Sequence, residues 1–217
     1  MTISVVASSS NVGGAGTITV TKPTGTANGN TMVAVSSCDN AGLYAALTAP
    51  TGWALLGGLD SGSGKSPIKI WTKVAASEGT SYAFGCTNGE DGVTIITTLT
   101  GVTTSISNWI CSFNFETGTG TTRTAPSITG SGEMLLSYSM ISQNGAAATF
   151  TTPSGMTECD ANNTGFVAAQ LAYLVSPSNP TGTKSWVASH AADFGGVSAS
   201  ILLANPSTNT TNFFFGG

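Results

Sequence analysis

Short stretches of this sequence alternate between apolar and polar side chains, which is the pattern of β-strands with one buried face. Residues 17–21 and 68–74 alternate in this way, whereas residues 32–36 and 93–99 are nearly continuous apolar runs. Such runs are typical of strands that are covered on both faces. Gly, Pro and Asn turns separate the strands, and no segment shows the spacing or the caps of a useful helix. The pattern predicts an all-β chain.

This pattern occurs twice along the chain. Residues 50–53, Pro-Thr-Gly-Trp, form a Pro-x-Gly turn before a large apolar residue, and residues 153–156, Pro-Ser-Gly-Met, repeat it 103 positions later. The strands around the two turns match in the same order, at offsets between 101 and 104. We therefore expect two similar halves, about residues 17–102 and 122–204, within a single domain of residues 1–204.

Many short strands separated by turns are typical of a β-sandwich. Two four-stranded units that face each other would give about eight strands. The sequence therefore predicts a jelly-roll-like antiparallel β-sandwich of about eight strands, built from two similar halves. The order of the strands within the sheets does not follow from the sequence.

The composition points to a protein of an outer surface. Charged residues make up 7% of the chain, against roughly 25% in ordinary globular proteins, so solubility depends on Ser, Thr, Asn and Gly. The net charge is −4, with only six basic residues, which excludes nucleic acid as an expected partner because phosphates need Lys and Arg. Hydrophobic residues make up 40% of the chain and fall in periodic runs, so the chain is expected to fold.

The start of the chain has neither a charged segment nor a long apolar segment of the kind found in signal peptides. No stretch approaches the length of apolar sequence that crosses a membrane. We therefore expect synthesis in a host cytoplasm, without a signal peptide and without a membrane partner. An exterior composition without an export signal fits a self-assembling particle that is released by lysis, or secretion by a C-terminal or accessory route.

The four cysteines, Cys38, Cys86, Cys111 and Cys159, are widely spaced. Zinc sites use clustered ligands, and the single histidine, His190, adds little. Two disulfides are one alternative, and four buried free thiols are the other. We favour the free thiols, since free cysteine packs as a small apolar side chain and the compartment of synthesis is reducing.

Candidate chemistry in the sequence is weak. His190 has no nucleophile motif such as Gly-x-Ser-x-Gly. The ten carboxylates are scattered, and the sequence does not say whether two of them face each other as in a glycoside hydrolase. Residues 90–91, and residues 158–160 together with Asn162 and Asn163, offer oxygen ligands for Ca²⁺, but without the spacing of a calcium loop. We expect no catalytic residues, no cofactor and no metal ion.

Several segments together carry a resemblance to a known class of proteins. They are an alternating strand that ends in Pro23, a Gly29-Asn30 turn before an apolar strand, the turn from Pro50 to Trp53, the strand from Trp71 to Ala75, and Gly101-Val102. In this order they resemble a β-sandwich module of tailed-bacteriophage virion proteins, which occurs in head decoration, minor tail and fibre-associated proteins. The resemblance spans nearly the whole chain and concerns fold, not chemistry. It implies a structural role in a virion.

Two parts of the chain are candidate contacts. Trp71 shares a strand face with lysines 69 and 73, so we expect it on the wetter face or under a neighbouring subunit, as a contact for a glycan or another protein. The polar residues 205–212 precede Phe213, Phe214 and Phe215. This tail is either the last strand of its own sandwich or an arm that docks on a neighbouring subunit.

The first hypothesis is therefore a non-enzymatic virion protein that binds major capsid or tail subunits and copies of itself, with capsid decoration favoured over the tail. The second is a carbohydrate-binding or adhesive module that recognises a host surface glycan. The third is a glycoside hydrolase.

Overall fold

The computed structural model describes residues 2–14, 16–39, 44–60, 66–86, 91–102, 109–143, 145–193 and 195–204. All regular secondary structure within these ranges is β-strand, and none of it is helix. The prediction of an all-β chain is confirmed. The strands are β1 (Ser4–Gly13), β2 (Gly16–Thr21), β3 (Thr31–Cys38), β4 (Ala54–Leu59), β5 (Ile68–Val74), β6 (Ser81–Cys86), β7 (Gly92–Thr100), β8 (Ile110–Glu116), β9 (Thr122–Ala125), β10 (Met134–Ser142), β11 (Phe150–Thr151), β12 (Thr157–Asn163), β13 (Val167–Val175), β14 (Lys184–Ala188) and β15 (Gly196–Leu203).

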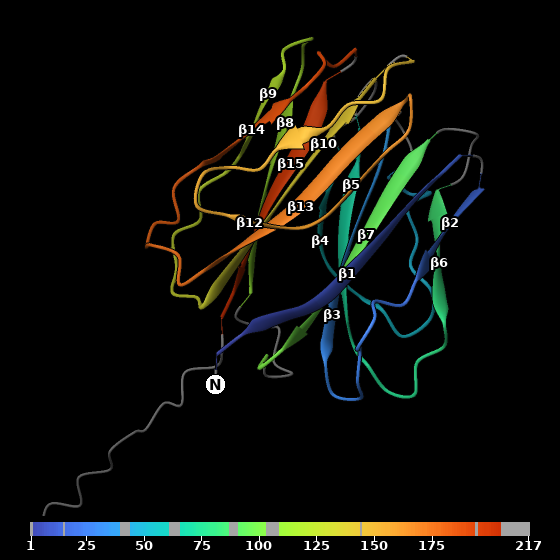
Figure 1. The fold of residues 1–217 in the computed structure, drawn as a ribbon, viewed down its shortest axis with the longest axis vertical. Coiled ribbons are helices and arrows are strands. Elements are labelled where there is room, and N and C mark those ends of the chain that lie inside the picture. Colours follow the sequence, from blue (N-terminus) through green and yellow to red (C-terminus); the bar gives the residue numbers. More distant parts are fainter. Residues whose placement is uncertain are drawn as a thin grey trace, which may run out of the picture.

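The strands pair antiparallel in four sheets. The first large sheet has the order β1-β7-β3-β5-β4, and the second large sheet has the order β12-β13-β10-β15-β8. The first small sheet pairs β2 with β6, and the second small sheet has the order β11-β14-β9. Figure 1 shows the two large sheets next to each other, with one small sheet on the outer side of each. The molecule is a stack of β-sheet layers.

The central core lies between the two large sheets. It takes Val35, Ile70 and Ile95 from the first large sheet and Tyr138 and Leu171 from the second, among other buried side chains. The Tyr138 hydroxyl donates a hydrogen bond to Ser37 Oγ across the two sheets, at 3.1 Å. The two halves of the chain therefore share one hydrophobic interior.

Outer cores fill the space between each large sheet and its small sheet. Between the first large sheet and the first small sheet, Trp71 and Ile96 pack with Phe84, and we call this cluster the first outer core. On the other side, Trp186 packs with Ala125, Ala172 and the partly buried Phe150. Both faces of the central strands of each large sheet are therefore covered.

This double covering explains the continuous apolar runs. Strands β3, β10 and β15 are buried along their whole length, and β7 is buried except at its last residue. Some of the polar side chains in these strands are paired with each other. Ser36 and Thr94 hydrogen-bond at 2.7 Å, and Ser139 and Ser198 do so at 3.1 Å. A buried polar group that is paired in this way avoids most of its desolvation cost.

The structure contains more strands than the expected sandwich of about eight strands. Fifteen strands lie in the described ranges. The difference comes from the short strands of the small sheets and from edge strands such as β4 and β12. β4 is an apolar run that contains two glycines and β12 is largely polar, so both carry little periodic signal.

The two halves use the same strand order. The first large sheet is β1-β7-β3-β5-β4, and the second is β8-β15-β10-β13-β12 when it is taken from its other edge. The pairing registers agree as well. Val35 pairs with Ile70 and Ile95, and Tyr138 pairs with Leu171 and Ala199. These residues are related by the same offsets, between 101 and 104, that the sequence shows.

The contacts between the halves are also reciprocal. Edge strand β1 lies beside β12, and its counterpart β8 lies beside β4, the counterpart of β12. This is the arrangement of an interface with two-fold character. The duplication and the boundaries 17–102 and 122–204 stay predictions. The strands β1 and β8 lie before those boundaries and take equivalent places at the sheet edges.

The repeated Pro-x-Gly turn has the same geometry in both halves. The Trp53 amide donates to the Pro50 carbonyl at 3.3 Å, and the Met156 amide donates to the Pro153 carbonyl at 3.0 Å. The third residue of each turn is glycine, with φ of +89° at position 52 and +79° at position 155. A type II turn requires this left-handed conformation at its third position, where a side chain would be strained.

The expectation of four free thiols is wrong for one pair. Cys38 and Cys86 form a disulfide between the ends of β3 and β6, whereas Cys111 and Cys159 are free. The sequence did not reveal the pair because 48 residues separate the two cysteines. Only the stacking of the first small sheet on the first large sheet brings them together in the first outer core.

Candidate functional site

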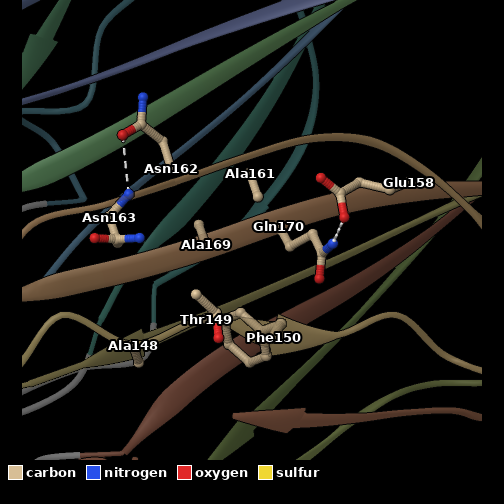
Figure 2. Close-up of a pocket in the computed structure, with 9 residues that line it drawn as sticks. All are labelled: Ala148, Thr149, Phe150, Glu158, Ala161, Asn162, Asn163, Ala169 and Gln170. Carbon is tan, nitrogen blue, oxygen red and sulfur yellow. Dashed lines mark hydrogen bonds between the residues drawn. The ribbon is translucent and has the colours of Figure 1, made fainter. Parts of the chain in front are cut away.

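A hollow of about 160 Å³ opens on the outer face of the second large sheet, near its β12 edge. Figure 2 shows it between β13, β12 and the segment that leads into β11. The lining side chains with polar groups include Glu158, Asn163, Gln170 and Thr149, and one aromatic ring, Phe150, borders the same space. Because strand residues alternate between faces, Glu158 and Gln170 lie on the face turned away from the central core.

Gln170 is the most constrained polar residue of the hollow. Its side-chain amide nitrogen donates to Thr152 Oγ1 at 3.1 Å and to the Glu158 carboxylate. The residue is only 1% exposed, and its Oε1 has no hydrogen-bond partner among the described residues. Figure 2 shows the amide between Glu158 and the Phe150 ring, with its oxygen on the side away from Glu158. A buried acceptor that lacks a partner costs about 1–3 kcal/mol.

The two carboxylates of β12 do not converge on this hollow. A bulge lies between Glu158 and Asp160, and the pairing register places them opposite Ala172 and Leu171 respectively. Leu171 belongs to the central core, so Asp160 lies on the inner face, where burial raises the pKa of its carboxyl group. Of the residues that line the hollow, Glu158 is the one acid. The paired carboxylates of a glycoside hydrolase are therefore not assembled there.

The other candidate residues lie apart from the hollow. His190 is exposed after β14, and its Nδ1 hydrogen-bonds with the hydroxyl of the adjacent Ser189 at 3.1 Å. Of the pair expected to offer oxygens to Ca²⁺, residue 90 lies outside the described residues, and Asp91 Oδ2 accepts a hydrogen bond from Thr164 Oγ1 at 3.2 Å. Within the described ranges, no three His, Cys, Asp or Glu side chains are grouped closely enough to hold a metal ion.

The expected exposure of Trp71 is wrong. Its side chain is 5% exposed and packs in the first outer core, with its ring centroid 5.6 Å from that of Phe84. The alternation correctly separates the two faces of β5. The first small sheet, however, covers the face that we expected to be exposed to solvent because it carries the two lysines. The lysines reach polar partners at the margin of that face. Lys69 Nζ donates to the Leu47 carbonyl, and Lys73 pairs with Glu78, each at 2.8–2.9 Å.

The tail residues Phe213, Phe214 and Phe215 lie outside the described residues, as does the whole segment 205–217. Both hypotheses for this tail, a last strand and a docking arm, stay open.

The two free thiols are partly buried on the inner side of the edge strands, against the central core. Burial raises the pKa of Cys111 and of Cys159 to about 12. The unfolded chain releases these protons near pH 9, whereas the folded chain retains them to higher pH. The thiols therefore favour the folded state below pH 9, and this contribution is lost as the pH rises toward 12.

We expect the free energy of unfolding to fall between pH 8 and pH 10 by about 1 kcal/mol for each of the two thiols. This window ends near the ordinary pKa of tyrosine. Urea denaturation at pH 8, 9 and 10 measures the effect. The double variant Cys111→Ala/Cys159→Ala should have a flatter pH dependence. An equal slope in the variant would show that the thiols do not carry the effect.

Sequence reasoning missed the hollow. The available signal was Gln170, a polar amide in the otherwise apolar strand of residues 167–175. Nothing in the sequence showed that this amide lies in the interior beside small residues.

No helix within the described ranges is long and apolar enough to cross a membrane. Comparison of the chain with family models, with curated proteins and with solved structures finds no match.

Proposed function

We propose that this chain is a structural subunit of a tailed-phage particle, which binds capsid or tail subunits and further copies of itself. Attachment to the capsid as a decoration protein is favoured over a place in the tail, because the sequence contains no coiled-coil heptads. The proposal starts from the resemblance carried by residues 17–23, 29–35, 50–53 and 71–75. The stacked sheets add a rigid scaffold of the kind that such subunits need.

The observation that carries the proposal is the chemistry of the surface. Only 7% of the residues are charged, while large apolar side chains remain exposed on both halves. These are Val6, Leu55, Val74, Ile110, Phe166, Val175 and Val187. A contact between such surfaces desolvates few ions and gains from apolar burial.

Mass spectrometry of purified particles tests the proposal directly. We expect the chain to be present in multiple copies per particle, and a particle map to show its layered sheets. Its absence from purified particles would contradict the proposal.

A surface variant tests the mechanism of attachment. Leu55 is 54% exposed on edge strand β4, so Leu55→Asp should leave the fold intact and change stability by no more than about 0.5 kcal/mol. We expect it to weaken binding to particles that lack the chain by at least about tenfold, which corresponds to about 1.4 kcal/mol. Sedimentation of the purified chain with such particles measures this.

The matched control is Thr51→Asp, which adds the same charge at a nearby exposed position. The control should bind as the unmodified chain does. Equal weakening by both variants would indicate a general effect of charge, and no weakening by Leu55→Asp would remove this surface from the contact.

A further inference from the structure

The two halves carry different residues at one pair of equivalent positions, on the outer face of each large sheet. Lys69 pairs with Ser36 in the first half, and Gln170 pairs with Ser139 in the second half. Their neighbours on the edge strands also correspond, because Gly58 pairs with Lys69 and Ala161 pairs with Gln170. The surroundings of Lys69 and Gln170 can therefore be compared directly.

In the first half an aromatic ring of the chain itself fills this place. Lys69 Nζ lies 4.3 Å from the centre of the Tyr44 ring. The same ring packs so closely on the edge strand that a Cβ at Gly58 would lie 2.8 Å from the Tyr44 hydroxyl. The tyrosine thus covers the lysine and the strand beside it.

In the second half no described residue takes the place of Tyr44 over Gln170, and the one ring that lines the space, Phe150, stands at its border. The segment that corresponds to the one carrying Tyr44 contains only small residues, from Gly145 to Ala148. The space beside Gln170 is the hollow of about 160 Å³. This is small beside the roughly 300–1,000 Å³ of typical ligand pockets, which suits one ring-sized ligand.

We propose that this hollow binds a single neutral sugar residue. The Glu158 carboxylate supplies acceptors for sugar hydroxyl groups and is held by the buried Gln170 amide nitrogen. The exposed Asn163 amide both donates and accepts. Phe150 supplies an apolar surface for the C–H face of the ring. A few polar groups beside an aromatic side chain are the usual composition of a small-ligand site.

The charge of the hollow sets the class of sugar. Glu158 is its one acid, and none of its lining residues is basic. A sugar with a carboxylate or phosphate group would therefore meet a like charge without compensation. The site is proposed for neutral hexoses and their N-acetyl derivatives. This proposal goes beyond the role in a particle and does not depend on it.

Nuclear magnetic resonance of the full chain tests the site. The probes are the methyl glycosides of glucose, galactose, mannose and N-acetylglucosamine, added up to tens of millimolar. We expect at least one of them to cause saturable shifts of backbone amide signals in residues 148–150, 158–163 and 169–170, with a dissociation constant in the millimolar range. Glucuronic acid should bind more weakly than the neutral glucoside.

The variant Ala161→Tyr places a ring beside Gln170, as Tyr44 stands beside Lys69, and should weaken binding at least tenfold. Ala54→Tyr is the matched control, since Ala54 is exposed on the edge strand of the first large sheet, and it should bind as the unmodified chain does. If Ala161→Tyr does not fold, Glu158→Ala is expected to give the same loss and decides the question.

Three results would overturn the proposal. They are no saturable shift with any neutral glycoside, undiminished affinity in both hollow variants, and tighter binding of glucuronic acid than of the neutral glucoside. Presence or absence of the chain in purified particles is measured separately, so the two proposals can fail independently.

Discussion

Replacing Tyr138 with alanine is expected to lower the free energy of unfolding by about 3–5 kcal/mol, the usual cost of removing a large aromatic side chain from a packed core. Tyr138 is fully buried in the central core between the two large sheets. Its hydroxyl group donates to Ser37 Oγ of the opposite sheet at 3.1 Å. The substitution therefore removes packing and a hydrogen bond at the contact between the halves.

The variant Tyr138→Phe separates these two contributions. It keeps the ring and removes only the hydrogen bond, so we expect a loss of about 0.5–1.5 kcal/mol. Urea denaturation monitored by circular dichroism and by tryptophan fluorescence measures both variants. The four tryptophans lie in the first outer core (Trp53 and Trp71), the central core (Trp109) and the second half (Trp186), so the fluorescence signal reports on both halves together.

Because the halves share the central core, the two signals should change in one transition, and both should shift together in Tyr138→Ala. Two separate transitions, with only the second half affected, would show that each half is stable alone. A cost of less than about 1 kcal/mol for Tyr138→Ala would show that the central core is loosely packed.

The sequence predicted the strands because their periodicity is local. Residues 32–36 form a continuous apolar run, and they lie in β3, which is buried on both faces. The turns at residues 50–53 and 153–156 were predictable for a similar reason, since proline and glycine determine their geometry within four residues. The offsets between the halves also agree with the pairing registers.

What the sequence could not provide was the packing of one sheet on another. The alternation of residues 68–74 separates an Ile face from a Trp and Lys face, but it does not show what covers either face. The disulfide between Cys38 and Cys86 depends on the same stacking. The hollow depends on it too, because only the comparison of Lys69 with Gln170 in space shows that the second half lacks the covering tyrosine.

Replacing Trp71 tests whether its side chain is exposed, as the alternation predicts, or packed in the first outer core, as in the structure. From the pattern alone, replacing it would remove a surface contact and leave stability unchanged. From the structure, Trp71→Ala empties part of the first outer core, where the ring packs with Phe84 and Ile96. We expect it to lower the free energy of unfolding by about 3–5 kcal/mol.

The control for Trp71 is Trp71→Phe, which keeps an aromatic ring and should recover more than half of that loss. Neither variant should change the sugar-dependent shifts at residues 158–163, because Trp71 lies in the first outer core and the hollow lies on the second half. Urea denaturation and the same glycoside titration measure the two effects in parallel. If Trp71→Ala left stability unchanged and abolished binding to particles or glycans, Trp71 would be the surface contact that the alternation predicted, and the burial of this face by the first small sheet would be refuted.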